Sequence, residues 1–290
     1  IPEFDAEEKE VESVLVVSHD ITESKKSENE IKAKNKKIHD SINYAERIQS
    51  TILPGNDLLR AYLPKSFMIF RPRDLVSGDF PWIFKVGDEI ILAAVDCTGH
   101  GVPGAMISLV GYFLLNEVVV GKGIYQPGEI LDELDRLVTD TFRQNSETSK
   151  IKDGMDVAIC RFNPNTGHLD YSGAHRPLYI VRHDGEEVEQ MKGDKFPIGG
   201  GSAFKNKTHF TNFEADLNEG DAFYIFSDGL PDQFGGPQDR KLGPKRIRAF
   251  VQEKKGTDML AMEHDMAQFL DDWQGTQRQF DDIIIFGVEY

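Results

Sequence analysis

Four aspartates stand where an apolar, strand-like segment begins or ends: Asp79, Asp96, Asp228 and Asp281. One aspartate at such a position is usually a turn residue, but four of them in the same setting require another explanation. Carboxylates gathered at one edge of a sheet repel one another and lose hydration, so the arrangement is favourable mainly where cations bind. Donor sets made only of oxygen select hard ions, Mg²⁺ or Mn²⁺.

The segment that follows Asp96 joins a carboxylate to a glycine-rich loop and a helix start. Residues 96–105 run Asp-Cys-Thr-Gly-His-Gly-Val-Pro-Gly-Ala. Glycines let the backbone pass close to a metal or an anion, and a helix N-terminus favours negative charge. We therefore expect this loop to line the binding site.

The composition excludes several classes of function. The 290 residues carry 49 Asp and Glu against 33 Lys and Arg, a formal charge of −16, which repels nucleic acids and anionic membrane surfaces. Cys97 and Cys160 lie in apolar segments, which predicts buried thiols in a reducing compartment and a cytoplasmic protein. The most apolar run, Ala105 to Leu115, is too short for a bilayer span of about 20 residues, so no membrane contact is expected.

Three zones follow one another along the chain. Residues 1–22 are expected to be the tail of an upstream domain or a cloning remnant. Residues 23–53 predict a helical linker with an apolar seam that includes Ile31 and Ile38. The seam favours a parallel coiled-coil homodimer, and the alternative is a single amphipathic helix lying on the next domain. Residues 54–290 predict one globular domain.

Within that domain, hairpin turns connect most of the strands, and the helices come in pairs. Strands are expected over residues 66–71, 79–85, 89–95, 155–162, 168–172, 177–181, 208–213, 222–226 and 282–288. Helices are expected over residues 103–120, 127–143, 245–253 and 258–273. This pattern predicts an α+β layered sandwich in which helices cover antiparallel sheets.

Six motifs, in this order, resemble those of the SpoIIE-like serine/threonine phosphatases, bacterial relatives of the type 2C metal-dependent (PPM) phosphatases. The resemblance covers about Ile38 to Tyr290, and residues 38–49 are similar to the linker helix that precedes this domain in sensor phosphatases. Residues 14–25 are similar to the tail of a PAS sensor domain. The six motifs are residues 72–80, 96–105, 152–156, 193–200, 227–234 and 279–283.

The resemblance implies an αββα four-layer sandwich that holds two Mn²⁺ or Mg²⁺ ions with a shared water. Asp96 would bridge both ions, Asp228 and Asp281 would complete one site, and Asp79 with the Cys97 backbone carbonyl would complete the other. The nucleophile would then be the metal-activated water, so no Ser, Cys or His nucleophile is required.

Other positions have more than one interpretation. His100 could donate a proton to the departing seryl oxygen, or it could be a structural loop residue. Asp153 and Asp156 could bind a secondary metal, or they could be turn and capping groups. Asp282 should point away from Asp281 and have a supporting role. Pro81 departs from the family pattern, since proline limits its strand to a sheet edge or a bulge.

These features predict a protein phosphatase of bacterial signalling that acts on a phosphoserine or phosphothreonine of a partner protein. By family resemblance, that partner would be an anti-sigma-factor antagonist of the STAS fold. One alternative is a catalytically silent dimeric module that only binds a partner. The other is a phosphoesterase acting on small molecules, which the absence of a Walker-type loop makes less favourable.

Overall fold

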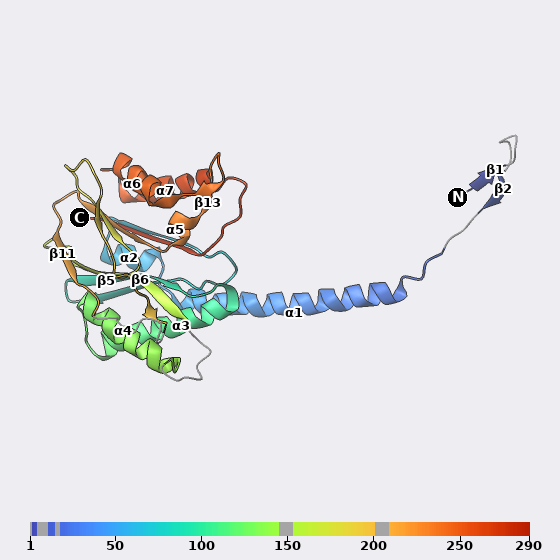
Figure 1. Ribbon diagram of the computed structural model, residues 1–290, viewed down its shortest axis with the longest axis horizontal. Helices are drawn as coiled ribbons and strands as arrows, with labels where there is room; N and C mark the ends of the chain where they lie inside the picture. Colours follow the sequence, from blue (N-terminus) through green and yellow to red (C-terminus); the bar gives the residue numbers. More distant parts are fainter. Residues whose placement is uncertain (1, 5–10, 15–17, 145–152, 201–208) are drawn as a thin grey trace. The chain divides into compact units, whose positions relative to one another are not determined.

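The computed structural model describes residues 2–4, 11–14, 18–144, 153–200 and 209–290, and the chain divides into two compact units. The first unit, Ile1–Tyr44, contains two paired antiparallel strands, β1 (Pro2–Phe4) and β2 (Val11–Val14), and most of helix α1 (Thr22–Ile52). The second unit, Ala45–Tyr290, contains both large sheets and the remaining helices (Figure 1).

Helix α1 forms where the sequence has no helix breaker, and local contacts set its ends. The Oδ1 atom of Asp20 accepts a hydrogen bond from the Thr22 N–H at 2.9 Å, which satisfies one of the free donors of the first turn. Pro54 and Gly55 follow the last turn. The helix predicted over residues 23–53 is therefore present with nearly the same limits. Ile31 and Ile38 are 58% and 57% exposed.

Two antiparallel sheets form the centre of the second unit. The six-stranded sheet has the order β11-β7-β6-β5-β4, with β10 paired to β6, and the five-stranded sheet has the order β3-β15-β12-β8-β9. The strands of the first sheet are β4 (Phe80–Val86), β5 (Glu89–Cys97), β6 (Gly154–Phe162), β7 (His168–Ala174), β10 (Ile198–Gly199) and β11 (Phe213–Asp216). Those of the second are β3 (Ser66–Arg71), β8 (Leu178–Val181), β9 (Glu189–Met191), β12 (Ala222–Phe226) and β15 (Ile283–Glu289).

Alternation along each strand divides the side chains between two cores. In β12, Phe223 and Ile225 enter the cluster between the two sheets, where they join Leu92 of β5. Tyr224 and Phe226, the alternate residues, enter the cluster beneath the outer helices. This two-residue period is the expected result of a strand that is buried on both faces.

Helices cover the outer face of each sheet (Figure 1). Helices α3 (Gly101–Asn116) and α4 (Pro127–Thr141), joined by the π-helical turn η1 (Glu117–Gly121), pack on the six-stranded sheet. Helices α6 (Gly243–Glu253) and α7 (Met259–Gln274) pack on the five-stranded sheet. The predicted α+β four-layer sandwich is confirmed.

Several short elements were not expected from the sequence. They include helices α2 (Asn56–Tyr62) and α5 (Gly229–Asp232), strands β9 and β10, and the pair β13 (Phe234–Gly235) and β14 (Arg240–Lys241), which are too short for a periodic pattern to reveal.

The strand expected over residues 208–213 was wrong. Residue 208 lies outside the described residues, and β11 begins only at Phe213. The Phe210 N–H instead donates to Asp132 Oδ1 of α4 at 2.9 Å, and the Phe210 ring packs in the core under α4. Phe210 and its neighbours therefore pack against helix α4 and do not pair with a strand of the sheet.

Pro81 and the cysteines agree with the expectations. Strand β4 is an edge strand with β5 as its neighbour, and Pro81 lies opposite Ala94 in their register. An edge is where a residue without a backbone donor is tolerated. Cys97 and Cys160 are free and buried.

The helical segment at Gly101–Gly121 is longer than the apolar run singled out in the sequence. Within the described part of the chain, it is the one helix that is long and apolar enough to cross a membrane by length and composition alone. A core helix passes the same test, and 44% of its most apolar window is buried inside the domain.

Candidate active site

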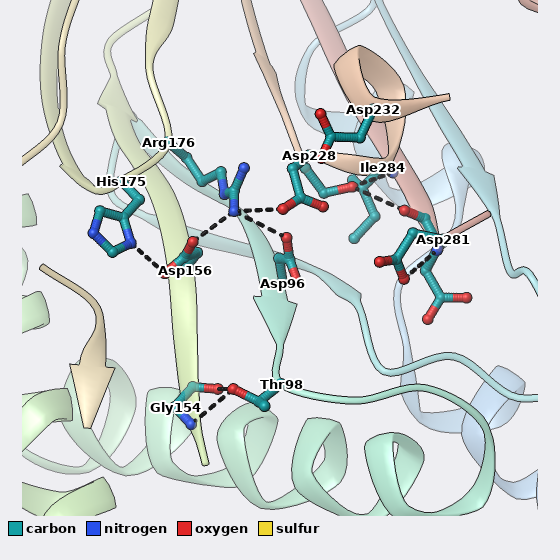
Figure 2. Close-up of polar contacts among 12 residues, drawn as sticks. Asp96, Thr98, Gly154, Asp156, His175, Arg176, Asp228, Asp232, Asp281 and Ile284 are labelled. Carbon is teal, nitrogen blue, oxygen red and sulfur yellow. Dashed lines mark hydrogen bonds and ion pairs between the residues drawn. The ribbon is translucent and has the colours of Figure 1, made fainter. Parts of the chain in front are cut away.

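The four predicted aspartates converge because antiparallel pairing brings strand ends together. Asp79 directly precedes β4, and Asp96 lies near the end of β5, the partner of β4. Asp228 follows β12, and Asp281 precedes β15, the partner of β12. Figure 2 shows the side chains of Asp96, Asp228 and Asp281 gathered at this edge of the sandwich.

Burial and mutual repulsion act on these carboxyl groups. Burial raises the pKa of Asp79 well above its ordinary value, and the charges of Asp96 and Asp282 raise it further. Burial also raises the pKa of Asp96 well above the ordinary value, with the charge of Asp228 as the next contribution. The pKa of Asp281 is raised as well, mainly by burial. Nearby positive charge would therefore stabilise the ionised site.

An arginine that the sequence analysis missed lies among these carboxylates (Figure 2). The Arg176 Nη2 atom donates to Asp156 Oδ2 at 2.5 Å and to Asp228 Oδ2 at 2.8 Å, and it lies 3.4 Å from Asp96 Oδ2. Asp156 of β6 stands directly opposite Asp96 of β5. Like charges opposite each other destabilise a strand pair, and this guanidinium offsets the repulsion.

Arg176 follows a turn with a strained backbone. His175 has a φ of 59°, a left-handed conformation that is uncommon for a residue with a Cβ. The Arg176 N–H donates to the Ala174 carbonyl at 2.7 Å, which closes a three-residue γ-turn of the rare, strained kind. The His175 N–H donates to the Asp194 carbonyl at 2.8 Å, and the Tyr171 hydroxyl donates to the Arg176 carbonyl. Such strain concentrates at functional sites.

His175 also contacts the acidic group through its side chain. Its Nδ1 atom lies 2.9 Å from Asp156 Oδ1 (Figure 2). A His-Arg pair that directly follows a strand, in a chain whose carboxylates need positive charge, is the signal that could have identified both residues.

Three glycines let the loop after Asp96 fit against the loop before Asp79. A Cβ on Gly78 would stand 2.3 Å from the Gly99 carbonyl oxygen, and a Cβ on Gly104 would stand 2.4 Å from the same atom. Real Cβ contacts are essentially never shorter than 3.0 Å. The two loops therefore need glycine in order to touch, and their contact sets the distance between the two aspartates.

Asp282 supports the loop that leads to Asp79. Its Oδ1 atom accepts a hydrogen bond from the Arg73 N–H at 2.7 Å, and its Oδ2 atom accepts one from the Gly78 N–H at 2.7 Å. The side chain is almost fully buried. The supporting role expected for Asp282 agrees with these contacts.

Gln49, in the last turns of α1, binds the same loop. Its Nε2 atom donates to the Ser77 carbonyl at 2.7 Å, and its Oε1 atom accepts from the Ser77 N–H at 2.9 Å. The Nε2 atom also donates to the hydroxyl of Ser108 in α3 at 3.0 Å. This buried carboxamide joins α1, α3 and the backbone two residues before Asp79.

Two other predicted residues have different surroundings. His100 precedes α3, its imidazole is 52% exposed, and its Nδ1 atom lies 3.3 Å from Asp74 Oδ2. Asp153 precedes β6, and its carbonyl accepts a hydrogen bond from the side chain of Gln144 at 2.6 Å.

The Cys97 backbone carbonyl faces the contact between the two loops. Its oxygen lies 3.5 Å from the point where a Cβ of Gly78 would stand. Burial raises the pKa of the Cys97 thiol well above its ordinary value, so the thiol stays protonated at neutral pH. This cysteine is therefore unsuited to act as a nucleophile.

The donor atoms fit a divalent cation. The Asp96 Oδ2 atom is buried and accepts no hydrogen bond, and its ion-pair contact with Arg176 Nη2 is 3.4 Å long, so it can still accept a cation. The neighbouring donors are carboxylate and carbonyl oxygens, which hard cations prefer. Over the described ranges, no group of three or more His, Cys, Asp or Glu side chains is already arranged as a metal site. The Arg176 guanidinium instead contacts Asp96, Asp156 and Asp228.

Comparison of the sequence with known proteins finds a family and a curated relative. Residues 87–290, more than half of the chain, match the family described as stage II sporulation protein E (SpoIIE). The phosphoserine phosphatase RsbU of Bacillus subtilis (strain 168) is 24% identical over 195 residues, which are 67% of this chain and 54% of RsbU. The chain thus spans about half the length of that relative.

Comparison of the structure finds similar folds. The SiaA-PP2C domain of Pseudomonas aeruginosa has a TM-score of 0.78 and 31% sequence identity, over 89% of this chain and 99% of that domain. RsbX, solved in complex with magnesium, has a TM-score of 0.55 and 15% identity, over 78% of this chain and 94% of RsbX. At that identity, the likeness to RsbX shows the fold alone.

Gly104→Ala tests the contact between the loops. The added Cβ would push the Gly99 carbonyl away, and we expect a loss of about 1–3 kcal/mol in the free energy of unfolding, as for other overpacked sites. Chemical denaturation measures this change. Gly55→Ala is the matched control, because nothing lies within 4 Å of the added Cβ. Equal losses in the two variants would contradict the packing argument.

Asp79→Asn tests the repulsion between carboxylates. In EDTA we expect the variant to melt higher than the wild type, because a buried charge that repels Asp96 is gone. A gain of about 1 kcal/mol would raise the Tm by about 2–4 °C. Because the pKa of Asp79 is raised in the folded protein, the gain in stability should be largest at pH values above that raised pKa. It should vanish at pH values below the ordinary pKa of an aspartate.

Thermal unfolding in EDTA at several pH values measures this gain, with Asp272→Asn, at an exposed position of α7, as the control. A variant that melts lower than the wild type in EDTA at high pH would show that Asp79 is not repelled.

Proposed function

Because the chain belongs to the family of stage II sporulation protein E (SpoIIE), we propose that it is a metal-dependent protein serine/threonine phosphatase of bacterial signalling. Water would hydrolyse the phosphomonoester of a phosphoserine or phosphothreonine on a partner protein, releasing inorganic phosphate and restoring the hydroxyl group. The observation that carries the proposal is the convergence of aspartates from both sheets around a buried oxygen of Asp96 that accepts no hydrogen bond.

Two Mn²⁺ or Mg²⁺ ions are the proposed cofactors. The residues that would hold them are Asp79, Asp96, Asp228 and Asp281, together with the Cys97 carbonyl. When bound, the ions supply an activated water and positive charge for the phosphoryl oxygens. The protein orients these donors through Asp282 and Gln49, whose hydrogen bonds fix the loop of Asp79. The magnesium bound to RsbX, a protein of the same fold, agrees with a hard divalent ion.

His100, Asp153 and Asp156 have proposed roles around this centre. His100 would give a proton to the departing seryl oxygen, and its partial exposure leaves the imidazole open to a protein substrate. Asp74 is placed to hold the ring, with its Oδ2 atom 3.3 Å from His100 Nδ1. Asp153 and Asp156 would bind a secondary metal, and for Asp156 this requires Arg176 to give up its contact.

The proposed substrate is a phosphorylated partner protein. RsbU is described as a phosphoserine phosphatase, which supports a phosphoserine on the partner. A STAS-domain anti-sigma-factor antagonist is the partner that the family resemblance favours. A protein substrate agrees with a site at an edge of the sandwich, where the side chain of Asp228 is 32% exposed.

Phosphate release from a phosphoserine protein, in Mn²⁺, Mg²⁺ or EDTA, tests the activity. We expect turnover with either metal and none in EDTA. Asp96→Asn should lower turnover by at least about a hundredfold, because Asp96 would hold both ions. Asp272→Asn, at an exposed helix position, serves as the control and should be active.

Two results would contradict the proposal. Partner binding without turnover in any metal would select a silent module. Turnover of p-nitrophenyl phosphate without turnover of the phosphoprotein would select a phosphoesterase of small molecules.

We also propose that α1 pairs with α1 of a second copy to form a parallel homodimer. Ile31 and Ile38 are large apolar side chains more than half exposed on a helix that is otherwise polar. A narrow apolar stripe of this kind is stable in water mainly when a partner helix covers it.

Cysteine substitution tests the pairing. Ile38→Cys and Ile42→Cys should each form a disulfide-linked dimer under mild oxidation, because seam positions of a parallel pair face each other. Non-reducing electrophoresis detects the product, and Lys36→Cys, at an exposed position on the opposite face of the helix, is the control. Dimers from Lys36→Cys alone, or from no variant, would contradict the parallel pairing.

A further inference from the structure

The Nε atom of Arg176 is a buried donor without a hydrogen-bond acceptor. The Nη2 atom of the same guanidinium contacts the aspartates. Leaving a buried donor without an acceptor is costly, so a ligand that supplies one would bind favourably there. An anion supplies such an acceptor.

The positive charge of Arg176 also favours an anionic ligand. A guanidinium stays protonated in proteins, so it cannot become neutral when divalent ions bind to Asp96 and Asp228, the carboxylates that it contacts. Positive charges so close together repel unless an anion lies between them. A phosphoryl group has enough oxygens to contact the ions and the guanidinium fork at the same time.

The backbone supports a role beyond charge balance. The γ-turn at His175 is strained, and hydrogen bonds to the Asp194 carbonyl and from the Tyr171 hydroxyl fix it. An arginine on an unstrained, flexible backbone could balance the negative charge equally well. The strained turn at His175 instead fixes the direction of the Arg176 side chain, which indicates that this direction is important for its role.

We propose that Arg176 binds the phosphoryl group of the substrate, with its Nε–H donating to a phosphoryl oxygen. This role rests on the proposed function and adds to it the side chain that selects a phosphate ester. Arg176 would then be a catalytic residue in contact with the substrate, held in place by Tyr171 and His175.

Arg176→Lys tests the proposal, because lysine keeps the positive charge but lacks the planar fork. The probe is inorganic phosphate, titrated calorimetrically into the Mg²⁺-loaded protein. We expect the Kd for phosphate to rise about tenfold or more, which is the loss of one hydrogen bond to a charged group. The KM for the phosphoprotein should rise as well. Phosphate affinity equal to that of the wild type would overturn the proposal.

Arg182→Lys is the matched control at the opposite end of the same strand. Arg182 follows β8, as Arg176 precedes it, and its Nη1 atom lies 2.9 Å from Asp221 Oδ2. We expect its phosphate affinity to equal that of the wild type, and a weakening equal to that of Arg176→Lys would overturn the proposal.

A second variant and a turnover assay of the wild type separate failure of this proposal from misfolding and from failure of the proposed function. If Arg176→Lys does not fold, Tyr171→Phe replaces it, because this change frees the Arg176 carbonyl and leaves the guanidinium intact. Unchanged phosphate affinity in Tyr171→Phe would then overturn the proposal. Wild-type turnover is measured in parallel. Absence of wild-type turnover would overturn the proposed function. Normal wild-type turnover, with the same phosphate affinity in the wild type and in the Arg176→Lys variant, would overturn only the role of Arg176.

Discussion

Electrostatic repulsion between buried carboxylates is the constraint on which the rest of the site depends. Asp79 and Asp96 are placed by the ends of paired strands, and the charge of Asp96 raises the cost of ionising Asp79. The guanidinium of Arg176 offsets part of this repulsion. A site that is unfavourable by itself and favourable with bound cations trades stability for binding.

Close backbone contact makes the convergence possible. The Gly99 carbonyl is enclosed by Gly78 and Gly104, and a Cβ on Gly229 would stand 2.0 Å from the Asp282 carbonyl. Asp228-Gly229 is therefore more than a turn, because its glycine lets the chain after β12 touch the chain before β15. The aspartates meet because the loops that hold them meet.

Residue type and position were enough to predict part of this arrangement. The aspartates followed from carboxylates at strand ends, and the layered α+β sandwich followed from the order of hairpins and helices, whereas its four layers came from the family resemblance. Arg176 was missed, although the His-Arg pair after β7 is a signal for it, because the positive φ of His175 that directs its side chain cannot be read from the sequence. The strand expected near residue 210 failed for a similar reason, since the contact of Phe210 with Asp132 of α4 outweighed local strand propensity.

The similarity to the family begins at residue 87, but the compact unit begins at Ala45. Both β3 and β4 lie before residue 87. Of the residues of α1, Gln49 alone is buried, and its carboxamide occupies both backbone groups of Ser77. Excision at residue 87 would remove an edge strand from each sheet, together with Asp79 and the Gln49 carboxamide that binds its loop. A fragment that keeps both edge strands and the Gln49 contact therefore includes the final turns of α1, which belong to the same compact unit as the two sheets.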